Sequence, residues 1–177
     1  MVYFWVYLFL KNKKMKKIIY ILGLLISSLG FSQQELKLDI ADALVIKSLE
    51  FSYEKHINAE NSFGISALFN LADQETAFRY NENMMITPYF RHYFSEDAKW
   101  NFFGEGFLGV NFGKTNSSGS DVLQNYTDAA LGVAVGTKYI SKGGLIIDAY
   151  AGIGRNLFGT DSPALVPRAG LNVGWRF

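Results

Sequence analysis

The sequence has 177 residues, of which 49% are hydrophobic, 16% aromatic and 19% charged, and this length fits a single domain. The absence of cysteine excludes disulfides, thiolate metal sites, a catalytic thiol and a lipoprotein anchor, and a mean hydropathy of +0.08 excludes a bundle of membrane helices. The formal net charge is +1, but residues 1–32 hold five lysines and no acid, so the remainder has an acidic excess without a basic stripe and predicts no nucleic-acid partner.

The N-terminal segment is predicted to be an export signal. Lysines at positions 11 to 17 precede an apolar run at residues 18–29, which has the length of a signal-peptide core and is too short to span a bilayer as a helix. Small residues at Gly30 and Ser32 place the expected cleavage before Gln33. We expect residues 1–14 to be an unused upstream start or an extra leading segment, residues 15–32 to be a Sec-type signal peptide, and residues 33–177 to be one domain. A short membrane anchor is the alternative.

Strand-like runs fill the rest of the chain, each with apolar and polar residues in alternation. They lie at residues 36–40, 49–54, 63–71, 84–94, 102–113, 131–139, 147–154 and 169–177. No convincing helical period separates them. Tight turns are predicted at residues 58–61, 95–98 and 141–144, longer polar connections at 73–82, 116–126 and 159–166, and a short connection near 44–47. This alternation of short and long connections is typical of transmembrane barrels.

The last run supports closure of the sheet. Apolar residues at 169, 171, 173, 175 and 177 alternate with Gly170, Asn172, Gly174 and Arg176. A strand at the edge of a sheet is exposed to unwanted pairing, and a barrel removes that edge by pairing its last strand with its first. The predicted fold is therefore all-β, an eight-stranded antiparallel up-and-down transmembrane β-barrel.

Alternation alone does not determine which face points inward. A soluble lipocalin-like carrier would enclose the apolar face and bind a ligand with it. The lipid-facing alternative is favoured by an aromatic group at the strand ends expected to lie at the periplasm, which is typical of an interfacial girdle. This group comprises Tyr53, Phe94, Trp100, Phe102, Tyr139, Trp175 and Phe177.

Charges of both signs share the opposite face of the strands. The predicted interior polar network comprises Glu50, Glu54, Arg91, Glu105, Lys138, Asp148, Arg168 and Arg176. An eight-stranded barrel is just wide enough for side chains to fill, and small residues on the same face, such as Gly132 and Gly152, would make room for long ones. Paired charges predict a salt-bridged plug, whereas unpaired ones would form a proton or ion path.

Other motifs give weaker signals. The GxGxxG match at residues 104–109 lies within a predicted strand, with no helix after it, and so predicts no dinucleotide site. His56 and His92 are expected at the water interface, and no metal, cofactor or catalytic residue is predicted. The acids Asp73, Glu75, Glu82 and Asp121 are expected in solvated loops, with calcium or lipopolysaccharide contact as the alternative.

Two further segments carry a family resemblance, LEFSYEK at residues 49–55 and ITPYFRHYF at residues 86–94. Together with the final strand, they resemble the small OmpA/OmpX-like outer-membrane barrels of gram-negative bacteria. The resemblance implies a non-enzymatic, monomeric structural or interaction protein of the bacterial outer membrane. Its implied partners are outer-membrane lipids, lipopolysaccharide and the barrel-insertion machinery, which would read Leu171, Val173, Trp175 and Phe177 as an assembly signal. The alternatives are a lipid-modifying hydrolase with His92 or His56 as base and the soluble carrier; a narrow conducting pore ranks below them.

Overall fold

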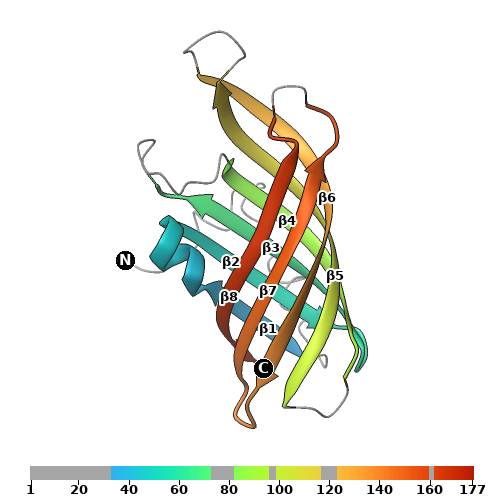
Figure 1. Cartoon of the computed structure of the whole chain (residues 1–177). Helices are drawn as coiled ribbons and strands as arrows, with labels where there is room; N and C mark the ends of the chain where they lie inside the picture. The colour runs from blue at the N-terminus through green and yellow to red at the C-terminus, as the bar shows by residue number, and fades with distance from the viewer. Residues whose placement is uncertain (1–32, 73–81, 96–98, 117–122, 160–161) are drawn as a thin grey trace, which may run out of the picture. The chain divides into compact units, whose positions relative to one another are not determined.

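The computed structural model describes residues 33–72, 82–95, 99–116, 123–159 and 162–177, so the signal-peptide prediction lies outside the described residues. Eight antiparallel strands form a closed barrel in which each strand pairs with the next in sequence and the last pairs with the first (Figure 1). The strands are β1 (Gln34–Asp39), β2 (Ser48–His56), β3 (Asn61–Asn70), β4 (Glu82–Tyr93), β5 (Trp100–Asn116), β6 (Leu123–Ile140), β7 (Leu145–Asn156) and β8 (Leu165–Arg176). This confirms the predicted fold class. Within the described segments, no helix is both long enough and apolar enough to cross a bilayer.

The barrel closes where β8 meets β1. Leu36 pairs with Trp175, and Leu38 pairs with Val173. The seam continues to the last residue, because the Phe177 backbone N–H donates to the Gln34 carbonyl at 2.9 Å and the Gln34 N–H donates back at 3.2 Å. The run at residues 169–177 therefore pairs with the first strand, as its pattern predicts.

The wall of the barrel is uneven in height. Strand β1 has 6 residues, whereas β5 has 17 and β6 has 18, and the β5–β6 hairpin projects beyond the neighbouring strands (Figure 1). The strand expected at residues 131–139 begins earlier, at Leu123. It therefore includes part of the loop expected at residues 116–126. Near its start, β6 exposes Asn125 and Thr127 on its outer face. A strand with polar residues on both faces loses the alternation from which strands are predicted.

The connection between β1 and β2 contains a short helix that the sequence did not predict. It is a π-helix of five residues, η1 (Asp42–Ile46), and the residue that follows it, Lys47, has a left-handed φ of 57°. The Lys47 backbone N–H donates to the Asp42 carbonyl. Asp42 is buried while Leu44 and Val45 are exposed. One helical turn is too short to create a detectable period, which is why the pattern missed it.

The barrel is polar inside and apolar outside. Among the described residues, 22 buried residues are polar or charged and 12 are apolar. The outward positions of the strands carry large exposed apolar side chains, including Leu36, Phe51, Phe63, Ile65, Phe90, Leu108, Leu131, Val133, Val135, Ile153, Leu171 and Trp175. This polarity is the reverse of a soluble lipocalin-like carrier and overturns that alternative.

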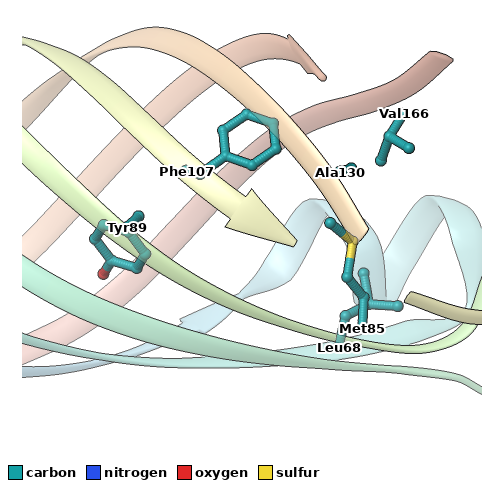
Figure 2. Close-up of a cluster of buried hydrophobic side chains, with 6 residues drawn as sticks. All are labelled: Leu68, Met85, Tyr89, Phe107, Ala130 and Val166. Carbon is teal, nitrogen blue, oxygen red and sulfur yellow. The ribbon is translucent and has the colours of Figure 1, made fainter. Parts of the chain in front are cut away.

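Aromatic rings, rather than charged side chains, occupy the space beside several inward glycines. Figure 2 shows Phe107 and Tyr89 in a buried cluster with Leu68, Met85, Ala130 and Val166. A Cβ on Gly132 would lie 2.3 Å from Phe107 Cζ, and a Cβ on Gly64 would lie 2.2 Å from Tyr89 Cζ. Gly132 and Gly64 therefore make room for aromatic rings, whereas the sequence predicted that the inward glycines would make room for long charged side chains.

Candidate functional site: the charged interior

Seven of the eight charges predicted to face inward are buried within the barrel. Glu50, Glu54, Arg91, Glu105, Lys138, Asp148 and Arg168 are at most 6% exposed. The side chain of Arg176, near the C-terminal end of β8, is 18% exposed. The period of two along each strand places all of these side chains on the inner face, and closure of the sheet then brings distant strands within reach of one another.

Glu54 on β2 is the hub of the resulting ionic network. Its Oε2 accepts from Lys37 Nζ at 2.6 Å and from Arg91 Nη1 at 3.2 Å, and its Oε1 accepts from Lys138 Nζ at 2.8 Å. The same carboxylate also accepts from the hydroxyls of Ser62, Tyr89 and Tyr93. One fully buried carboxylate therefore links cations from β1, β4 and β6, which is the pairing that buried charges require.

Arg91 on β4 connects this hub to the opposite wall. Its Nε donates to Glu105 Oε2 at 2.7 Å, and its Nη1 donates to Asp148 Oδ2 on β7 as well as to Glu54. The guanidinium carbon lies 4.0 Å from the centroid of the Phe103 ring. Arg91 thus contacts three carboxylates and an aromatic face at once, and a guanidinium is suited to that environment by its planar fork of donors.

Arg168 on β8 extends the network along the barrel axis. Its Nε donates to Glu105 Oε1 at 2.9 Å and its Nη1 donates to Glu50 Oε1 at 3.2 Å. Arg91 and Arg168 therefore share the Glu105 carboxylate, one on each oxygen. The sequence predicted that Arg91, Arg168, Glu50 and Glu105 face inward, and the structure brings them into one connected set.

At the end of the barrel that holds the C-terminus, the network includes a histidine. His56 Nε2 lies 3.1 Å from Glu35 Oε1, and the imidazole stacks on Tyr93 with 5.3 Å between ring centroids. Arg176 contacts both Glu35 and His56. His56 ends β2, as expected, but it is only 9% exposed and belongs to the network. His92 is exposed, as expected, and its Nδ1 lies 3.0 Å from Asn61 Oδ1.

Several further charged residues lie in the interior that are not part of the predicted network. Glu35, Lys37 and Asp39 on β1, Asp42 on η1 and Glu82 on β4 are all buried. The signal for the β1 residues was present, since Lys37 and Asp39 alternate with Leu36 and Leu38. Glu82 was expected in a solvated loop and instead begins β4. The other acids of that group, Asp73, Glu75 and Asp121, lie outside the described residues.

Two groups of side chains have donor atoms close enough to hold a metal ion. In the first, Glu35, Glu54 and His56, the carboxylates already bind Lys138, Lys37 and arginines. In the second, oxygens of Asp39, Asp42 and Glu50 lie within 4.8 Å of one another. Burial, reinforced by the neighbouring Asp39 and Glu50 carboxylates, raises the pKa of Asp42 to about 7. The GxGxxG match at residues 104–109 lies within β5, as expected for a structural stretch.

Comparison with known proteins identifies the fold. The N-terminal β-barrel domain of Pseudomonas aeruginosa OprF aligns with 82% of this chain and 96% of its own, with 14% identity and a TM-score of 0.60. Neisserial surface protein A aligns with 82% of this chain and 92% of its own, with 15% identity and a TM-score of 0.48. Yersinia pestis Ail in a phospholipid nanodisc aligns with 83% of this chain and 100% of its own, with 14% identity and a TM-score of 0.49. No family model and no curated protein matches the sequence. The chain therefore shares the fold of the OprF barrel domain.

Proposed function

We propose that residues 33–177 form a monomeric barrel of the bacterial outer membrane with a structural or interaction role and without enzymatic activity. The observation that carries this proposal is the polarity of the wall, which exposes apolar side chains such as Phe51, Phe63 and Val133 around a charged interior. In a bilayer, a closed barrel satisfies every backbone group while its outward residues meet lipid. Export through the Sec-type signal at residues 15–32 would deliver the chain to that membrane.

The interior supports a closed lumen rather than a conducting one. Arg91 contacts carboxylates from β2, β5 and β7, and Phe103 and Tyr150 flank its guanidinium. Lys37 on β1 reaches across to Asp148 on β7 at 2.8 Å. Ion pairs that cross the barrel fill its cross-section, and opening a path through them would leave buried charges without partners. These contacts support the plug that the mixed charges predict.

The outer surface supports contact with lipid and lipopolysaccharide. Phe94, Trp100, Phe102, Trp175 and Phe177 are exposed near one end of the barrel, and Trp100 packs against Tyr139 at 5.3 Å between ring centroids. Aromatic residues at one level fit a membrane–water interface. We assign this end to the periplasm, where the insertion machinery would read the outward residues Leu171, Val173, Trp175 and Phe177 during assembly.

Fractionation followed by gel electrophoresis tests the location and the fold together. We expect the protein in the outer-membrane fraction, with an unboiled sample that migrates differently from a boiled one. Recovery in the soluble periplasm would contradict the proposal. Incorporation of the purified barrel into planar bilayers tests the lumen: the wild-type protein is expected to give no steady conductance, and a stable open level would contradict the plug.

A further inference from the structure

Most of the charged side chains of the interior belong to a balanced group or to an unbalanced group. The balanced group, which lies toward the C-terminal end of β8, sets four acids, Glu35, Glu54, Glu105 and Asp148, against four bases, Lys37, Arg91, Lys138 and Arg176. The second group lies where β1, η1 and β2 meet and consists of Asp39, Asp42 and Glu50. We refer to these three residues as the acidic triad.

The acidic triad has only one basic neighbour at ion-pair distance among the described residues. Arg168 Nη1 donates to Glu50 at 3.2 Å, and Arg168 also donates to Glu105 of the balanced group. Within the described ranges, no lysine, arginine or histidine forms an ion pair with Asp39 or Asp42. The three carboxylates are at most 4% exposed, and in the described part of the chain only Glu50 among them bonds a guanidinium. Buried carboxylates in that arrangement require further positive charge, as a cation or as protons.

Two oxygens of the triad point independently to a missing partner. Asp39 Oδ1 accepts from the backbone N–H of Asp42 at 3.0 Å and of Leu171 at 3.4 Å, which fixes the orientation of the carboxylate. Its other oxygen, Oδ2, has no hydrogen-bond partner, and neither does Asp42 Oδ2. Asp39 is fully buried and Asp42 is 2% exposed, so bulk water does not serve these oxygens.

The surroundings leave space for a small ligand at the triad. A cavity of about 20 Å³ is lined by Asp42 and Glu50 of the triad, by Arg168 and by a fourth acid, Glu82. This volume exceeds that of about one water-sized sphere, so it admits one ion or one water molecule. Asp39 does not line this cavity, but one of its oxygens lies within 4.8 Å of oxygens of Asp42 and Glu50. On the other side, a Cβ on Gly170 would lie 2.1 Å from Asp39 Oδ2, so the absence of a side chain at Gly170 leaves room for the carboxylate.

We propose that the acidic triad binds a divalent cation of the kind that prefers oxygen ligands, with Ca²⁺ as the best-fitting member of that class. Carboxylate oxygens are the ligands that such cations take, and Ca²⁺ tolerates irregular geometry better than Mg²⁺ does. One divalent ion together with Arg168 neutralises the three carboxylates. The ion ties together β1, η1 and the start of β2, the shortest part of the barrel wall.

The test uses the barrel purified from membranes in detergent, and it does not depend on where the protein resides in the cell. Thermal unfolding is followed by circular dichroism and by the unboiled gel shift in EDTA, in CaCl₂, in MgCl₂ and in NaCl of matched ionic strength, at pH 7.5. We expect CaCl₂ to raise the midpoint by several degrees over NaCl, with MgCl₂ giving a smaller shift. Isothermal titration with CaCl₂ is expected to give about one site per chain.

Three variants distinguish a specific Ca²⁺ site from nonspecific attraction of cations to the acidic residues. Asp42→Asn replaces a carboxylate ligand with a neutral amide and is expected to abolish the Ca²⁺-dependent shift. Gly170→Ala keeps every charge but crowds Asp39, and it is expected to weaken Ca²⁺ binding at least tenfold. Glu60→Gln, on an exposed turn, is the matched control and is expected to keep the full shift.

Several results would overturn the site. A wild-type midpoint that is the same in EDTA and in CaCl₂ would show that the triad holds protons instead. An equal shift in Asp42→Asn and in the wild type would place the binding elsewhere. If Asp42→Asn does not fold, titration of the wild type and of Gly170→Ala still decides the question, and the absence of a saturable site in the wild type refutes the proposal.

Discussion

Lys138 on β6 and Asp148 on β7 stand opposite each other in the register of the sheet, yet each forms its ion pairs with other strands. Lys138 Nζ lies 2.7 Å from Glu35 on β1 and 2.8 Å from Glu54 on β2. Asp148 accepts from Lys37 on β1 at 2.8 Å and from Arg91 on β4. The interior charges therefore connect walls that the backbone hydrogen bonds leave unconnected.

Loss of charge at Glu54 is expected to destabilise the barrel strongly. Glu54→Gln leaves Lys37, Lys138 and Arg91 buried with one carboxylate fewer, and breaking a buried pair in this way costs about 3–5 kcal/mol. Urea unfolding of the detergent-solubilised barrel measures the change in the free energy of unfolding. Glu60→Gln, on an exposed turn, should stay within about 0.5 kcal/mol of wild type. An equal effect of the two substitutions would show that the network contributes little.

A methyl group at Gly152 is expected to disturb the β6–β7 contact. Its Cβ would lie 2.4 Å from the Val133 carbonyl oxygen and 2.4 Å from Ala134 Cβ, so the backbone has to move. Overpacking of this kind costs about 1–3 kcal/mol, and the same urea titration measures it. Gly106→Ala is the matched control, because a Cβ there meets nothing within 4 Å. Destabilisation by both alanines alike would point to backbone entropy or strand propensity instead of crowding.

Removal of the Asp128 carboxylate is expected to loosen the β7–β8 connection. Asp128 on β6 accepts from the backbone N–H of Phe158 at 2.9 Å and of Gly159 at 2.7 Å, and also from the Ser162 hydroxyl. Without these bonds the segment has fewer contacts to hold it, and exposed loops are preferred sites of proteolysis. Asp128→Ala should therefore be cleaved near residue 159 several times faster than wild type by a nonspecific protease. Unchanged cleavage would mean that the loop is held by other contacts.

Removal of the Phe177 side chain distinguishes recognition by the insertion machinery from stability of the folded barrel. Its side chain is 59% exposed, whereas its backbone forms the hydrogen bonds to Gln34 that continue the seam. Phe177→Ala keeps this backbone, so refolding of the purified protein in detergent should match wild type. The amount of heat-modifiable barrel in cells should fall several-fold if the insertion machinery reads the aromatic ring. Equal amounts in cells would refute the assembly-signal proposal.

The inward and outward faces of the strands could be predicted because side chains alternate between the two faces along a strand, apart from an irregularity at the start of β4. Glu50 and Glu54 share a face wherever β2 begins or ends, so errors in strand length left their orientation unaffected. The partners of each charge could not be predicted in this way. The contact between Lys37 and Asp148 joins residues 111 positions apart, and it depends on the diameter of the closed barrel rather than on local pattern.

The burial of Asp42 and Glu82 was harder to predict, for a different reason. Asp42 lies on η1, a single turn whose neighbours Leu44 and Val45 are exposed, so neither a strand nor a helix period marks it as buried. Glu82 follows a polar stretch and resembles a loop residue in sequence. Their burial follows from the placement of η1 and of the start of β4, and that placement is decided by tertiary packing.

The ion pair between Glu35 on β1 and Arg176 on β8 bears on the order of folding. Until the last strand reaches the first, each of these residues lacks the other, and Glu35 is fully buried once the barrel is closed. In a nearly complete sheet both side chains would therefore be hydrated, and joining the terminal strands would pair their charges and remove their water in one step. Ring closure is thus expected to be all-or-none, with few half-closed barrels exposed to the cell's proteases.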